Sequence, residues 1–151
     1  MTSKSSASAN RSGTSPTTGL TRDVGWEIGV SRTVDQPIDQ VWSYLTSPDG
    51  IRRWLGGGLV LPSDKGAEYR TPDGTTGDLR SFHPGDRIRL TWRPADWDHS
   101  TTLQIVVRAN GDRTSLRFHQ ERLADSGERE QQRRHWATVA NGIVEDLARS
   151  D

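Results

Sequence analysis

Hydrophobic and polar residues first alternate in the stretch that begins at Trp26. Trp26, Ile28 and Val30 share one parity, which continues to Val34, and polar or small residues occupy the positions between them. A period of two residues is typical of a β-strand with one buried face. We therefore predict a first strand over residues 26–34.

Helical spacing replaces this alternation in the next segment. Ile38, Val41 and Leu45 follow one another at intervals of three and four residues, which predicts a short helix. A second short helix is predicted over residues 48–55, because it begins with proline, which is tolerated at a helix N-terminus. The glycine triplet at 56–58 ends it.

Six short stretches separated by turn-forming residues come next. The predicted strands cover residues 59–61, 68–70, 78–83, 87–93, 101–108 and 114–122. Short turns such as Asn110-Gly111-Asp112 require neighbouring strands to be antiparallel. Ile88, Leu90 and Trp92 share one face and arginines occupy the other, so the predicted sheet has one dry face and one wet face.

The last predicted element is a proline-free helix that begins at Asp125 or Ser126 and ends near Ser150. Trp136 and Ile143 belong to an apolar stripe at helical spacing. Such a helix is about 38 Å long, which is enough to cross the sheet. Gly142 lies beside the stripe; either close packing or a ligand explains it, or it is simply a tolerated glycine.

The order of elements is one strand, two short helices, six strands and a long helix, which predicts an α+β fold with two layers. Residues 2–19 are rich in Ser and Thr and contain no large apolar side chain. Such a segment does not offset the entropy lost on ordering. We therefore expect a disordered tail over residues 1–22 and a single folded domain over residues 23–151.

Composition excludes several classes of function. The 151 residues include no cysteine, which excludes disulfides and cysteine-based zinc sites, and the four histidines lack metal-ligand spacing, so no metal is expected. Lys and Arg number 20, as do Asp and Glu, which argues against nucleic acid as a partner. The sequence contains no phosphate-binding loop, so no cofactor is expected. No apolar run is long enough to span a membrane, so we expect a cytoplasmic protein.

A series of local sequences, in a fixed order, carries a family resemblance. Its members are Pro37 with Val41-Trp42, Arg53-Trp54-Leu55, Gly66 with Tyr69, Asp73-Gly74 with Gly77, His83-Pro84 with residues 87–92, Gly111 with Thr114-Ser115-Leu116, and His135-Trp136. The series resembles the START-like (SRPBCC) superfamily, and within it the AHSA-type branch, named after an activator of a heat-shock-chaperone ATPase. This resemblance implies a helix-grip fold, in which a curved antiparallel sheet wraps around the long C-terminal helix. The sequence departs from the family pattern at Gln120, where members often have His, and at Leu55, where they usually have Phe.

The resemblance also implies a cavity between the sheet and the last helix, which many members use for lipids, sterols, polyketides or plant hormones. Inward positions of both elements would wall such a cavity. The predicted lining residues are Tyr69, Trp92, Leu116, Phe118, Gln120, His135, Trp136, Val139 and Ile143, and the predicted gate residues are Trp54 and Trp97. For the tryptophans, ordinary core packing is the alternative.

Three functions stay open. The first is non-catalytic binding of a small hydrophobic or amphipathic molecule in that cavity, and the second is a stress- or chaperone-associated interaction with a protein partner, as a monomer or a homodimer. The third is a polyketide cyclase or aromatase, with His135, Gln120 or Tyr69 as the proton handler, although no catalytic residue is assigned. An interior filled by tryptophan would argue against the first and the third.

Overall fold

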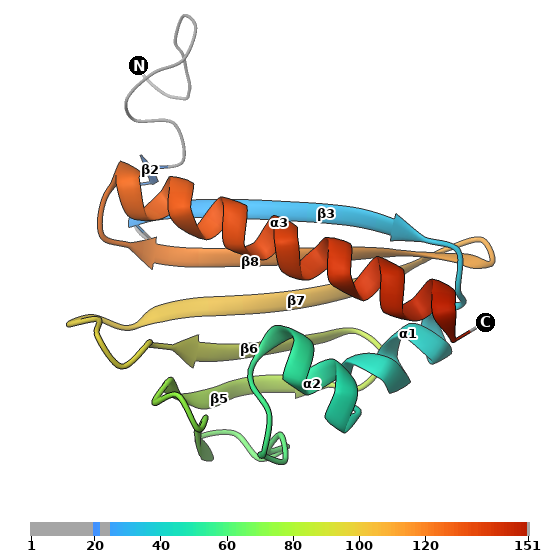
Figure 1. Ribbon diagram of the computed structural model, residues 1–151, viewed down its shortest axis with the longest axis horizontal. Helices are drawn as coiled ribbons and strands as arrows, with labels where there is room; N and C mark the ends of the chain where they lie inside the picture. The colour runs from blue at the N-terminus through green and yellow to red at the C-terminus, as the bar shows by residue number, and fades with distance from the viewer. Residues whose placement is uncertain (1–19, 22–24, 151) are drawn as a thin grey trace, which may run out of the picture.

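The computed structural model describes residues 20–21 and 25–150 (Figure 1). Its strands are β2 (Leu20–Thr21), β3 (Gly25–Val34), β4 (Glu68–Arg70), β5 (Thr76–His83), β6 (Arg87–Trp92), β7 (Thr101–Asn110) and β8 (Arg113–Leu123). Its helices are α1 (Ile38–Leu45), α2 (Pro48–Trp54) and α3 (Ser126–Arg149). The predicted α+β class and both short helices are confirmed.

All the described strands join one antiparallel sheet, in the order β2-β3-β8-β7-β6-β5-β4. Figure 1 shows the three helices on the same side of this sheet, with α3 running along β3 and β8 and with α1 and α2 over the other half. The chain therefore has the helix-grip arrangement that the resemblance implied. The opposite face of the sheet is the wet face.

The alternation in β6 is reproduced by burial. Ile88, Leu90 and Trp92 are buried, whereas Arg89 and Thr91 on the other face are partly exposed. The buried residues face α3 and the two short helices, together with Leu116 and Phe118 of β8, and form one core with them. One dry face and one helical layer suffice to enclose this core.

The predicted strand at residues 59–61 is wrong, because Leu59, Val60 and Leu61 form no strand. Gly56 and Gly58 before them adopt positive φ angles of 152° and 78°, which turn the chain away from the sheet. Val60 is 90% exposed, whereas Leu59 and Leu61 are partly buried against the core, so the segment packs on the core without pairing with a strand. Three residues are too few for a period to identify a strand.

The structure also refines the start of the folded domain and the start of α3. Leu20 and Thr21, which we expected within the tail, pair with Trp26 and Gly25 of β3; the rest of that tail lies outside the described residues. At the other end, the carboxylate of Asp125 accepts a hydrogen bond from the backbone N–H of Glu128 at 2.7 Å. Asp125 is thus the N-cap of α3.

Candidate functional site

Aromatic rings pack against one another between α3 and the sheet. Trp136 is fully buried on α3, and its ring stacks on Phe118 of β8 with centroids 5.3 Å apart and planes 16° apart. Trp92 of β6 meets the same indole edge-on at 5.6 Å. These three predicted lining residues therefore contact one another.

A chain of buried hydrogen bonds connects the same residues. The indole Nε1 of Trp136 donates to Oε1 of Gln120 at 2.8 Å, and Nε2 of Gln120 donates to Oγ1 of Thr101 at 2.9 Å. The Thr101 hydroxyl in turn donates to the Trp92 carbonyl at 2.7 Å. Each polar group thus has a protein partner, as buried polar groups generally require.

The other predicted lining residues are also in the core or at its margin. Leu116, Val139 and Ile143 are buried, and Tyr69 donates its hydroxyl to the Thr91 carbonyl at 2.6 Å. Burial raises the pKa of the Tyr69 hydroxyl, so it keeps its proton at neutral pH. None of the predicted lining residues borders the two surface pockets described below.

The two predicted gate residues have different surroundings. Trp54 is buried at the end of α2, and its indole donates to the Leu45 carbonyl at 2.9 Å. Trp97 is partly exposed in the loop between β6 and β7, with its ring stacked on His99 at 5.0 Å and edge-on to Trp92 at 5.5 Å. Trp97 therefore extends the aromatic cluster to the surface.

Two histidines lie beside this cluster. His135 is exposed overall, but its ring packs on Trp136 with the ring centroids 4.6 Å apart. Desolvation by burial lowers the pKa of its imidazole. His99 lies between two carboxylates, with Nδ1 2.9 Å from Asp98 and Nε2 2.7 Å from Glu128, and hydrogen bonds to both raise its pKa. Within residues 25–150, no group of three or more His, Asp or Glu side chains is arranged to hold a metal ion.

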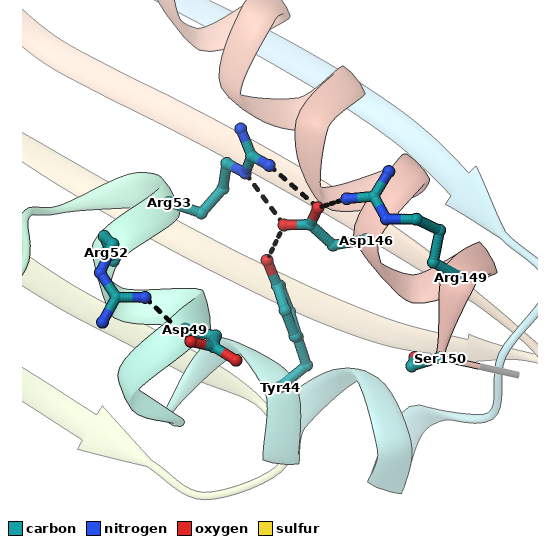
Figure 2. A pocket seen from close by; sticks show the side chains of 7 residues that line it. All are labelled: Tyr44, Asp49, Arg52, Arg53, Asp146, Arg149 and Ser150. Carbon is teal, nitrogen blue, oxygen red and sulfur yellow. Dashed lines mark hydrogen bonds and ion pairs between the residues drawn. The ribbon is translucent and has the colours of Figure 1, made fainter.

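The larger of the two pockets is a cleft between α2 and the end of α3, with a volume of about 620 Å³ (Figure 2). It is lined by Tyr44, Asp49, Arg52, Arg53, Asp146, Arg149 and Ser150. Asp146 lies at its centre: Arg53 donates to both carboxylate oxygens, from Nε at 3.0 Å and from Nη2 at 2.9 Å. The Tyr44 hydroxyl and Nη2 of Arg149 donate to the same carboxylate.

Hydrogen bonding and burial set the protonation states of Asp146 and Tyr44 in this cleft. The hydrogen bond from Arg53 is the main cause that holds the pKa of Asp146 below its usual range. Burial, reinforced by the hydrogen bond to Asp146, raises the pKa of Tyr44 to about 12. At neutral pH the carboxylate is therefore ionised and the phenol is protonated, so the hydrogen bonds among them persist.

The sequence did not identify this cleft, because its central residues are far apart in the chain. Tyr44 and Asp146 are separated by 102 positions, and Arg53 and Asp146 by 93. One signal was present, at Gly142: a Cβ atom there would lie 2.9 Å from Cζ and Nη1 of Arg53. Of the three interpretations of this glycine, the contact with Arg53 supports close packing.

The smaller pocket is an apolar groove of about 180 Å³. It is lined by Thr46, Pro48, Ile51, Leu59, Val60, Leu61 and Phe82. The segment wrongly predicted as a strand thus forms one wall of a surface groove.

A family model matches most of the chain. The matched region, residues 35–148, is that of the "Activator of Hsp90 ATPase homolog 1-like protein" family. The chain belongs to this family. The match begins directly after β3 and extends to the last turn of α3, so it covers α1, α2, the strands from β4 to β8 and nearly all of α3. No curated protein sequence matches the chain.

Solved structures share the fold at low sequence identity. DynU16, a protein in the dynemicin biosynthetic locus, is 21% identical over 81% of this chain and 47% of its own, with a TM-score of 0.69. This chain thus spans about half of DynU16. CalU16 from Micromonospora echinospora is 20% identical over 80% of this chain and 73% of its own, with a TM-score of 0.68.

Another similar structure is an HSP90 activator. PFC0360w from Plasmodium falciparum is 14% identical over 81% of this chain and 96% of its own, with a TM-score of 0.68. At such identities the likeness establishes the fold alone. Among the described helices, none is long and apolar enough to cross a membrane.

Proposed function

We propose that this protein is a non-catalytic interaction module that binds a protein partner through its surface. The observation that carries the proposal is the close packing of buried side chains beneath α3. Trp136, Phe118 and Gln120 occupy the region where a family cavity would lie, and the polar atoms of Trp136 and Gln120 have partners there. A molecule bound at this position would have to displace these side chains, which would leave buried polar groups unpaired.

The surroundings of the three suggested proton handlers support a non-catalytic role. Gln120 is an amide whose oxygen and nitrogen are both engaged, and Tyr69 is hydrogen-bonded to a backbone carbonyl. His135 packs its ring against tryptophan. General acid–base catalysis needs a titratable group within reach of the substrate proton.

The proposed partner is a chaperone ATPase of the Hsp90 type. The family is named for its likeness to a homolog of an activator of the Hsp90 ATPase, and PFC0360w, which shares the fold, is described as an HSP90 activator. To test this, the ATPase rate of an Hsp90-type chaperone from the same source is measured while the protein is titrated. A saturable rise in rate is expected; no change in rate together with no binding in calorimetry would refute the proposal.

A second candidate is the binding of a small apolar molecule, and the aromatic cluster at the surface favours it. Trp97, His99, Trp92 and His135 make contiguous ring contacts that extend from the core to the loop between β6 and β7. Aromatic side chains often line small-molecule sites. Native mass spectrometry of gently purified protein would reveal a retained molecule, which Trp97→Ala should release.

A further inference from the structure

The cleft in Figure 2 has more positive charge than its carboxylates balance. Three guanidinium groups line it, from Arg52, Arg53 and Arg149, against the two carboxylates of Asp49 and Asp146. Arg52 pairs with Asp49 at 2.8 Å, so the other two arginines share Asp146. One positive charge among the residues that line the cleft is therefore not neutralised.

Asp146 leaves much of the donor capacity of these arginines unused. A guanidinium group carries five N–H donors. Asp146 receives hydrogen bonds from Nε and Nη2 of Arg53 and from Nη2 of Arg149. Arg149, whose side chain is 66% exposed, uses only Nη2 in this contact, so it retains donors for a further acceptor in the cleft.

Arg53 is fixed in place before any ligand arrives. Its guanidinium packs against Gly142 of α3, where a Cβ atom would lie 2.9 Å from Cζ and Nη1. Asp146 holds one edge of the same group, at Nε and Nη2, and Tyr44 supports the carboxylate from α1. Donors that are already ordered lose less entropy when they bind.

A purely structural role, in which these side chains act as a clamp that holds α1 and α2 against α3, explains only part of this arrangement. The contacts of Tyr44 and Arg53 with Asp146 join α1 and α2 to α3, and a clamp needs nothing more. The side chains of Arg52 and Arg149 are 62% and 66% exposed and line the same opening. Exposed ion pairs of this kind add little to stability.

We propose that this cleft binds an oxyanion, a carboxylate or phosphate group carried by a small organic molecule or by an acidic segment of a protein partner. The planar, forked donors of arginine match both groups in bidentate geometry. The volume of about 620 Å³ is within the usual range for small-molecule sites. This inference does not depend on the chaperone partner proposed above.

The test is an NMR titration at constant ionic strength, which follows the backbone amides and the arginine Nε–H signals. One arm uses inorganic phosphate and the other a short polyglutamate peptide. Saturable shifts at Arg53 and Arg149 are expected in at least one arm. Shifts with phosphate indicate a free anion, and shifts with the peptide alone indicate an acidic segment; the absence of saturable shifts in both arms refutes the proposal.

Two matched variants separate a site from general charge screening. Arg149→Gln removes one cation of the cleft and leaves the contact between Arg53 and Asp146 in place, so binding should weaken at least about tenfold. Arg133→Gln is the control, because Arg133 also forms an ion pair three residues apart on α3, with Glu130, about 24 Å from Arg149 along the helix. Equal weakening in both variants would refute a defined site.

Discussion

The indole N–H of Trp136 and the amide oxygen of Gln120 are 2.8 Å apart, and both side chains are fully buried. The amide nitrogen of Gln120 faces Thr101 on the neighbouring strand, so the amide has one orientation that satisfies both partners. The pair therefore links α3 to β8 and β7 through the centre of the core. It also lies in the region where the family resemblance implied a cavity.

Gln120→Leu should lower the free energy of unfolding by about 1–3 kcal/mol, because the indole N–H of Trp136 loses its acceptor while staying buried. Urea denaturation measures the change. The control is Gln131→Leu on the exposed side of α3, which should shift stability by less than about 0.5 kcal/mol. Equal effects of the two variants would contradict the role assigned to Gln120.

The effect of Gly142→Ala on stability should depend on whether Arg53 is present. In an Arg53→Ala background, alanine at 142 should stabilise the protein by about 1 kcal/mol, because alanine favours helix over glycine. With Arg53 present, the new Cβ displaces the guanidinium from its position against α3 and weakens its contact with Asp146. The gain in stability should therefore shrink or reverse. Thermal and urea unfolding of the native protein, the two single variants and the double variant measures this coupling. Additive changes in the free energy of unfolding would argue against the packing of Arg53 on Gly142.

Gly77→Ala should destabilise the fold by about 3 kcal/mol or more, because overpacking against backbone leaves little room to relax. A Cβ atom at position 77 would lie 1.9 Å from the Thr91 carbonyl oxygen and 2.6 Å from the Tyr69 hydroxyl. Gly29→Ala is the matched control in β3, since its Cβ would meet only the flexible end of Arg117. Denaturant midpoints that ranked Gly29→Ala as the more damaging change would overturn this interpretation.

The contacts of His99 should make stability depend on pH. Hydrogen bonds to Asp98 and Glu128 raise the pKa of His99 above its ordinary value of 6.5. A raised folded-state pKa means that this contribution is complete below about pH 6.5 and is lost as the pH rises through the folded-state pKa. The stability advantage of the native protein over His99→Gln should therefore be larger at about pH 6 than at about pH 8. A constant difference across that range would show that the charged imidazole contributes nothing.

The fold was predictable where a segment was long enough for the spacing of its apolar residues to show a clear period. The alternation of Ile88, Leu90 and Trp92 and the stripe that includes Trp136 both reflect burial. The segment 59–61 was too short for such a signal, and the positive φ of Gly58 before it directs the chain into a surface loop. The start of α3 was uncertain by one residue until the hydrogen bond at Asp125 identified the cap.

The cleft was beyond reach of the sequence for a different reason. Asp146 and Arg149 resemble any ion pair three residues apart on an exposed helix face. Their role depends on Tyr44 and Arg53, which only the tertiary fold brings to them. Sequence patterns report which face of an element is buried, but not which distant polar side chains meet there.

The placement of α3 has a consequence for how the chain acquires its structure. This helix contributes Trp136 and Ile143 to the core and is made after every strand of the sheet. A chain growing from its N-terminus therefore exposes the apolar side of β3 and β8 until residues 126–149 have been synthesised. Contacts between distant segments form slowly, and exposed apolar surface favours aggregation meanwhile. The helix that completes the core is thus also the element that protects the newly synthesised chain from aggregation.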